Sequence, residues 1–210
     1  MIDTSPHPVL NPVTRQGWVA RRFEENAAMF MAAARSAYPE TVERAAECIA
    51  NALVTGRKLL VFGNGGSASD AQHLCGELVV RFENRRRALP AIALVVDAAV
   101  LTACANDFSY EHVFARQIEG LGAPGDVALG ISTSGTSANV LAGLRAARGI
   151  GMITILLTGP ERIGVLREAD TVLAAPGSNT ARIQELHLAS YHAICEAVDA
   201  RVLAEDAKIG

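Results

Sequence analysis

The amino-acid sequence predicts an α/β fold: a doubly wound, mainly parallel sheet of about five strands, flanked by helices and preceded by helices at the N-terminus. The chain has 210 residues, of which 50% are hydrophobic and 20% charged, with a formal net charge of −3. These values are typical of an ordinary globular chain. After Gly56, short apolar runs alternate with helix-like segments. Continuous apolar runs of this kind indicate parallel strands that are covered on both faces.

The N-terminal quarter of the chain has a different pattern. Residues 1–17 contain several prolines and are expected to form a loose arm. Residues 18–55 are rich in Ala, Glu and Arg, with apolar residues at helical spacing, and so predict two helices broken near Pro39. Residues 56–203 then form the α/β core. No repeat, linker or low-complexity tract divides the sequence, so we expect a single domain over residues 1–210.

The strands and the last helix can be placed from their apolar patterns. The predicted strands are residues 58–62, 91–96, 126–131, 152–157 and 171–174. The last helix, from about residue 181 to 203, has apolar residues around more than one face, as a helix with a second partner would. In doubly wound sheets, ligands bind beyond the carboxyl ends of the strands. The residues that follow each apolar run are therefore the candidates for a functional site.

Composition excludes several classes of function and partner. The mildly negative charge offers no basic surface for direct binding of nucleic acid. The most apolar stretch, residues 88–104, contains Pro90 and Asp97 and is too short to span a membrane. The N-terminus lacks the pattern of a secretory signal. Four cysteines without a C-x-x-C pair indicate buried thiols in a reducing compartment, so we expect a cytoplasmic protein.

A glycine-rich segment, GNGGSASD, follows the first predicted strand at residues 63–70. Glycines allow the backbone to approach a ligand closely, and the N–H groups at a helix start attract anionic oxygens. The spacing matches neither the dinucleotide-binding pattern nor the phosphate-binding P-loop. On its own, this segment is equally consistent with a structural turn.

A second loop, STSGTS at residues 132–137, follows the third predicted strand and precedes a helical stretch. Its five hydroxyl groups around one glycine could surround a phosphate group with O–H and N–H donors, without any cationic side chain. A helix cap alone would need only one of these hydroxyls. The loop therefore favours a phosphate site.

Several residues on two of the predicted helices could bind a metal ion or move protons. His73 and Glu77 are four residues apart, on one face of the helix after the glycine-rich segment. Gln184, His187 and His192 on the last helix are candidates to complete a zinc site. Taken singly, however, each histidine is more often a packed or hydrogen-bonded residue than a metal ligand.

Taken together, the motifs identify a family resemblance. GNGGSASDAQH, LPAIAL, AND at residues 105–107, GDVALGISTSGTSANV and ARIQELH resemble the phosphoheptose isomerases of the sugar isomerase (SIS) superfamily, over roughly residues 26–202. The resemblance implies conversion of sedoheptulose 7-phosphate to D-glycero-D-manno-heptose 7-phosphate through an enediol. It also implies a homotetramer with one zinc ion per subunit and active sites near the interfaces, where groups such as Glu77 and His192 could meet across a boundary between chains.

The same resemblance assigns roles to individual residues. The implied metal ligands are His73, Glu77, Gln184 and His192. Glu77 would also be the general base and His192 its partner acid, while His187 is left as a packing residue. The implied substrate-binding residues, besides Glu77 and Gln184, are Asn64, Gly65, Gly66, Ser67, Asn106, Asp107, Ser132, Thr133, Ser134 and Ser137. The zinc ion could polarise the carbonyl group or merely hold its ligands.

Three features depart from this pattern or lie outside it. Ala181 stands where some relatives have an aspartate, so any role of that carboxylate is missing, and Thr136 replaces an asparagine but keeps a hydrogen-bonding group. The run of arginines at 85–87 is interpreted as a solvated loop.

The alternative function is a non-catalytic SIS-fold regulator, such as a sugar-phosphate sensor or a tetramer that binds the replication initiator. The presence of both Glu77 and His192 favours the enzyme, because a binding protein needs neither a base nor an acid.

Overall fold

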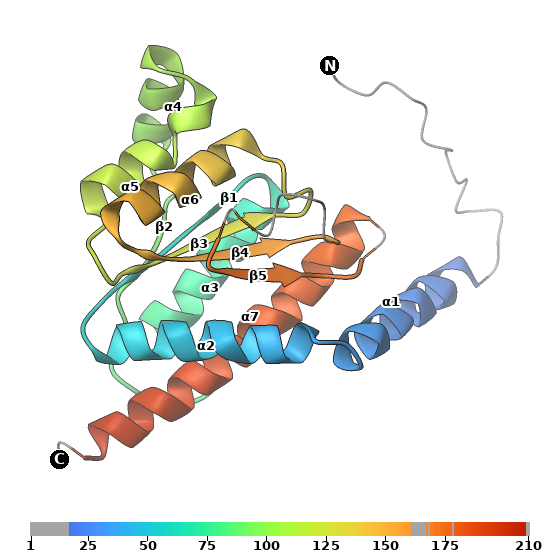
Figure 1. The fold of residues 1–210 in the computed structure, drawn as a ribbon. Coiled ribbons are helices and arrows are strands. Elements are labelled where there is room, and N and C mark those ends of the chain that lie inside the picture. The colour runs from blue at the N-terminus through green and yellow to red at the C-terminus, as the bar shows by residue number, and fades with distance from the viewer. Residues whose placement is uncertain (1–16, 161–166, 168, 178, 209–210) are drawn as a thin grey trace.

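A computed structural model describes residues 17–160, 167, 169–177 and 179–208, and within these residues it contains one five-stranded sheet (Figure 1). All neighbouring strands are parallel, in the order β2-β1-β3-β4-β5. The strands are β1 Leu59–Gly63, β2 Ala91–Ala93, β3 Val127–Ser132, β4 Ile153–Thr158 and β5 Thr171–Ala174. The prediction of a doubly wound parallel sheet is confirmed. The predicted second strand, residues 91–96, is shorter in the structure, because β2 is an edge strand that pairs with β1 alone.

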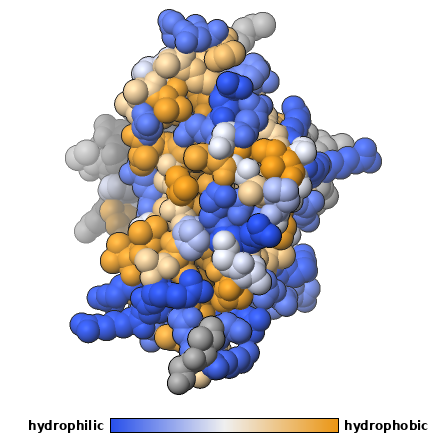
Figure 2. Space-filling model, turned by 90° about the vertical axis from the view of Figure 1, so that its left-hand side faces the viewer, coloured by the Kyte–Doolittle hydropathy of each residue, from blue (hydrophilic) through white to orange (hydrophobic). Residues whose placement is uncertain are grey.

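Helices cover both faces of the sheet (Figure 1). One face carries α2 Tyr38–Val54, α3 Gly66–Val79 and α7 Thr180–Asp206; the other carries α4 Ala98–Asp107, η2 Tyr110–His112, α5 Ala115–Leu121 and α6 Ala138–Ile150. Alternate residues of β1 serve the two layers: Leu59 and Val61 pack with the first group of helices, and Leu60 and Phe62 with the second. This period of two is the pattern of a strand buried on both faces. On the face of the molecule drawn in Figure 2, hydrophobic and hydrophilic residues are intermixed.

The first helix, α1 Trp18–Ala34, extends away from the sheet (Figure 1). Only Met29 and Ala33 of this helix are buried, whereas the Phe23 side chain is 70% exposed. The predicted break is confirmed, because α1 ends before Pro39, which lies in the first turn of α2. Most of the predicted arm, residues 1–16, lies outside the described residues. Among the described residues, every helix is too short or too polar to cross a membrane.

The arginine run at 85–87 corrects one interpretation of the sequence. The Arg86 side chain is 0% exposed and pairs with Asp199 of α7, so it does not belong to a solvated loop. Arg87 does follow the expectation, with a side chain that is 43% exposed and paired with Asp206. The sequence contains no periodicity that separates these two neighbours. Their difference comes from the path of the loop over α3 and α7.

Candidate active site

Two loops lie side by side at the carboxyl ends of the central strands. β1 and β3 are paired along their whole length, with Gly63 opposite Ile131, so the segments that follow them are adjacent. After β1 the chain forms β2 on one side of β1, and after β2 it forms β3 on the other side of β1. The order of the strands therefore reverses between β1 and β3, which is where such sheets hold their ligands. The glycine-rich loop leads into α3 and the hydroxyl-rich loop into α6.

The glycine-rich loop is shaped by residues without side chains. Gly65 has a φ of 56°, in the left-handed region that favours glycine. At Gly66, an added Cβ would overlap the amide of Gln184, which reaches over the loop from α7. The predicted substrate residues Gly66 and Gln184 are therefore neighbours, although 118 positions separate them in the sequence.

Asn64 is held by two residues that the sequence analysis did not identify. Its side-chain amide forms a reciprocal pair with that of Asn139 on α6, with N···O distances of 2.8 and 2.9 Å. The Tyr110 hydroxyl donates to the same Asn64 oxygen at 3.0 Å. The available signal was the position of Asn139, a polar residue two positions after the STSGTS loop, which the structure buries. These bonds link both loops and fix the orientation of Asn64.

The hydroxyl groups of the second loop bond to one another. The Ser132 and Ser137 oxygens are 2.8 Å apart, and Ser134 accepts from the N–H and hydroxyl of Thr136 at 3.2 and 3.0 Å. Ser137 is the residue that precedes α6, yet its side chain makes no capping bond to that helix. The hydroxyls thus line the start of α6 without being used as helix caps, which suits a ligand with several acceptor oxygens.

A second group of site residues lies further along α3 and α7. Nε2 of His73 is 3.0 Å from Oε1 of Glu77, and the two side chains are 44% and 25% exposed. One ligand atom from each of His73, Glu77 and His192 lies within 4.8 Å of the others. Nε2 of His192 is buried and has no hydrogen-bond partner among the described residues. Two imidazoles and one carboxylate at this spacing are a donor set that zinc accepts.

Tyr191 contacts the His73 ring of this cluster at Nδ1, the ring nitrogen that does not face Glu77. Its hydroxyl oxygen is 3.0 Å from Nδ1 of His73 and 3.5 Å from Oδ1 of Asp70. Burial raises the pKa of Tyr191, and the nearby Asp70 charge raises it further. Burial also raises the pKa of Asp70, although the bond from Tyr191 opposes that change. Because Tyr191 occupies Nδ1 of His73, the Nε2 atom of His73 is left facing Glu77.

Gln184 of α7 borders the glycine-rich loop, because its amide lies next to Gly66. It is eight residues before His192 on the same helix, about 12 Å along the helix axis. Its role as a metal ligand stays a prediction. The predicted contact of Gln184 to substrate also stays a prediction. Gly65 and Thr133 lie in the two loops already described, and Ser67 is buried in the first turn of α3.

Three further residues of the sequence analysis are placed away from the cluster. Asn106 and Asp107 are exposed in the last turn of α4, where the Asn106 amide donates to Asp107 at 2.8 Å. No hydrogen bond among the described residues joins them to the other site residues, so their role stays a prediction. His187 is fully buried, and its Nε2 lies 3.0 Å from the Thr158 carbonyl oxygen. Burial lowers the pKa of His187 to about 4, which fits the expected packing residue.

Comparison with known proteins places the chain in a family. The SIS domain family matches residues 22–159. A phosphoheptose isomerase from a Bradyrhizobium species is 50% identical over 182 residues, which cover 87% of this chain and 91% of the relative. The chain belongs to the phosphoheptose isomerase family. A second such relative, from Paramagnetospirillum magneticum, is 49% identical over 170 residues, 81% of this chain and 88% of its own length.

A solved family member has the same fold. The phosphoheptose isomerase from Neisseria gonorrhoeae superposes with a TM-score of 0.81 at 39% identity, covering 87% of this chain and 97% of its own. One expectation drawn from the family needs correction. Glu77 and His192 were expected to meet across a boundary between chains, but the structure brings them together within one chain. They meet because α3 and α7 pack against each other on the same face of the sheet.

Proposed function

We propose that this chain isomerises sedoheptulose 7-phosphate to D-glycero-D-manno-heptose 7-phosphate. The observation that carries the proposal is the convergence of Glu77 with His73 and His192, on the helices that also border the hydroxyl-rich and glycine-rich loops. A carboxylate base, an imidazole and a phosphate site are the groups that an aldose–ketose isomerisation needs. The relatives at about half identity are named for this activity.

The residues of the chain divide the reaction between them. The hydroxyls and N–H groups of the 132–137 loop bind the phosphate, and Asn64 orients the hydroxyl groups of the sugar. Glu77 takes the proton from C1 of the ketose, which leaves the enediol, and returns a proton to C2 to form the aldose. His192 gives a proton to the oxygen on C2 and accepts one from the oxygen on C1. The proton count is then the same at the start and at the end.

The direct test of this function is incubation with sedoheptulose 7-phosphate, followed by separation of the ketose and aldose phosphates. The reaction is run with and without a metal chelator. We expect an equilibrium mixture of the two sugar phosphates from the untreated protein. Full retention of the ketose by folded, metal-loaded protein would reject the isomerase. The non-catalytic alternative predicts binding of the sugar phosphate without any conversion, so the same assay separates it.

We further propose one zinc ion per subunit. His73, Glu77 and His192 supply three ligands that converge in the structure, and the resemblance implies Gln184 as a fourth. Imidazole nitrogens and carboxylate oxygens are ligands that zinc accepts. When bound, zinc would polarise the oxygens that carry charge in the enediol. The Tyr191 contact to Nδ1 of His73 is the kind of support that keeps a ligating imidazole in orientation.

The first prediction concerns this metal. Protein purified without chelator is expected to contain close to one zinc per chain, and the variant His73→Ala with His192→Ala is expected to contain almost none. Elemental analysis measures both. The control is His187→Gln, which removes a buried imidazole that bonds to a carbonyl oxygen and should leave the zinc content unchanged. Equal zinc in the double variant and the wild type would remove the cluster from consideration as the metal site.

We also propose that the chain assembles as the homotetramer that the resemblance implies. Three large apolar side chains of α1 are exposed to solvent: Trp18 (44%), Phe23 (70%) and Met31 (50%). This exposure is unfavourable, and packing against a second chain would remove it. A groove of about 560 Å³ between α2 and α7 is lined by small apolar residues with charged residues at its rim. Its lining residues include Ala46, Ala50, Ala193 and Ala197. Such a groove offers space for a helix of another copy.

The second prediction tests this assembly. Phe23→Glu places a charge on the exposed apolar face of α1, and it is expected to lower the oligomer mass without unfolding the α/β core, because Phe23 contributes little to the core. Light scattering measures the mass, and circular dichroism checks the fold. The matched control is Glu24→Gln, a change at the next position of the same helix. An unchanged tetramer in Phe23→Glu, or a monomeric wild type, would contradict the proposed interface.

For the cellular setting we propose the cytoplasm and no direct nucleic-acid partner. All four cysteines of the described structure are free, and three of them are buried. Burial raises the pKa values of Cys75 and Cys195 to about 12, so these thiols stay protonated. Thiols of this kind behave as small hydrophobic groups and suit a reducing compartment.

A further inference from the structure

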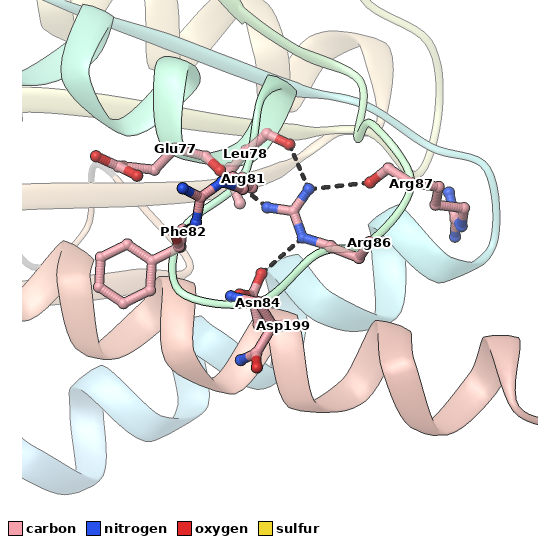
Figure 3. Close-up of polar contacts among 8 residues, drawn as sticks. All are labelled: Glu77, Leu78, Arg81, Phe82, Asn84, Arg86, Arg87 and Asp199. Atoms are coloured by element: carbon pink, nitrogen blue, oxygen red, sulfur yellow. Dashed lines mark hydrogen bonds and ion pairs between the residues drawn. The ribbon is translucent and has the colours of Figure 1, made fainter.

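A buried ion pair joins the loop between α3 and β2 to α7 (Figure 3). The proposed reaction does not use this pair directly. Nε of Arg86 lies 2.6 Å from Oδ1 of Asp199 on α7, and the two side chains are 0% and 1% exposed. The other Asp199 oxygen accepts the backbone N–H of Asn84 at 3.2 Å. Desolvation of two charges offsets most of their attraction, so a buried pair of this kind contributes little stability by itself. We therefore attribute its main effect to the segments that it holds together, the loop after α3 and the helix α7.

The remaining donors of Arg86 bind the carboxyl end of α3. Its terminal nitrogens donate to the carbonyl oxygens of Leu78 at 2.8 Å and Glu77 at 2.9 Å, and one of them also donates to that of Arg87 at 3.0 Å. The last carbonyls of a helix have no partner within the helix, and a positive charge is favourable there. The planar fork of a guanidinium group can bind a carboxylate and two carbonyls at once, which an ammonium group cannot.

These contacts act on the residue that carries the chemistry. Glu77 is in the last turn of α3, where helices tend to fray, and Arg86 binds its own carbonyl oxygen. Asp199 is seven residues, about two turns, beyond His192 on α7. Phe82, in the same loop as Arg86, packs against His192 with ring centroids 5.4 Å apart. One guanidinium group therefore ties the backbone of the base to the helix of the acid.

We propose that Arg86, oriented by Asp199, is a positioning residue that holds Glu77 at its working distance from His192. The proposal rests on the proposed isomerase function, since it assigns Glu77 the role of base. Arg86 itself is not a catalytic residue: its guanidinium group contacts main-chain oxygens and the Asp199 carboxylate, and the Glu77 side chain points away from it (Figure 3).

The test is Arg86→Lys, which keeps a positive charge for Asp199 but loses the fork. We expect kcat per folded molecule to fall roughly 10- to 100-fold, because a displacement of about 1 Å at the reacting groups can cost about 100-fold. KM should stay within roughly threefold of the wild-type value, because the substrate loops are not touched. The matched control is Arg87→Lys, which alters the neighbouring, exposed ion pair and should change neither constant.

A second measurement does not depend on turnover. Hydrogen exchange followed by mass spectrometry should show faster exchange in residues 77–82 for Arg86→Lys than for Arg87→Lys, because the end of α3 has lost its bonds to Arg86. If Arg86→Lys does not fold, the double variant Arg86→Met with Asp199→Leu removes both charges, and such replacements of a buried pair usually stay folded. The same fall in kcat and the same faster exchange are expected from it.

The outcomes separate this inference from the proposed function. A folded Arg86→Lys protein with wild-type kcat and unchanged exchange would overturn the positioning role while the isomerase stands. A loss of activity that matches the loss of folded protein, with normal kcat per folded molecule, would overturn it as well. A wild-type protein that leaves sedoheptulose 7-phosphate unchanged would instead reject the proposed function, and the exchange result would then still report whether Arg86 holds the end of α3.

Discussion

Glu77→Gln is expected to lower kcat by about 100-fold or more, because it removes the proposed general base while keeping the size of the side chain. The glutamine can still pair with His73, which lies 3.0 Å from Glu77 in the wild type, so the fold of α3 should be preserved. Stopped assays with sedoheptulose 7-phosphate measure kcat. Calorimetric titration measures binding of the sugar phosphate, which we expect to stay close to the wild-type affinity because the hydroxyl-rich loop is unchanged.

The control for this variant is Glu83→Gln, which removes an exposed carboxylate from the loop after α3. Its kcat should equal that of the wild type. Zinc content is measured for both variants, so that a loss of metal is not mistaken for a loss of the base. Near wild-type turnover by metal-loaded Glu77→Gln would remove Glu77 from the proton transfer.

Gly159→Ala is expected to disrupt the hydroxyl-rich loop. Gly159 follows β4, and its N–H donates to the Thr133 carbonyl oxygen at 3.0 Å. A Cβ at this position would overlap that same backbone oxygen and would lie 2.8 Å from Cδ1 of Ile183. Because a main-chain atom cannot move alone, the 132–137 loop must shift. We expect KM to rise about 10-fold or more, a change of about 1.4 kcal/mol in binding, and the free energy of unfolding to fall by about 1–3 kcal/mol.

The matched control for Gly159→Ala is Gly149→Ala in α6. A Cβ at Gly149 meets no atom within 4 Å. Alanine is the better helix former by up to about 1 kcal/mol, so this protein should be slightly more stable and have an unchanged KM. Substrate titrations and thermal unfolding compare the two variants. An unchanged KM in folded Gly159→Ala would show that the 132–137 loop does not hold the phosphate.

Much of the fold could be predicted from local patterns. Apolar runs indicate strands buried on both faces, and the rule that ligands bind beyond the carboxyl ends of parallel strands directs attention to the residues that follow the runs at 58–62 and 126–131. The i, i+4 spacing of His73 and Glu77 places both on one helix face, which the 3.0 Å contact confirms. The motifs that resemble the family then identified the candidate substrate-binding residues of both loops. These signals are local, so they could be read from a linear sequence.

Pairings between distant segments could not be predicted in this way. The sequence analysis did not place Gln184 next to Gly66, because this contact joins α7 to a loop 118 positions earlier in the chain. It missed the Asn64 and Asn139 pair, which forms only because β1 and β3 are neighbours. Side-chain partners of this kind depend on how helices cross a sheet, and no local periodicity encodes the crossing.

The arginine run shows the same division most clearly. Composition alone determined that residues 85–87 are strongly basic, and a basic run is usually solvated. Only the tertiary structure decided that Arg87 stays at the surface while Arg86 is buried between the end of α3 and Asp199 of α7. The physical reason is that a charge can be buried only where a partner charge and free carbonyl oxygens meet it. The partner charge comes from α7, 113 residues further along the chain, and the carbonyl oxygens come from the end of α3.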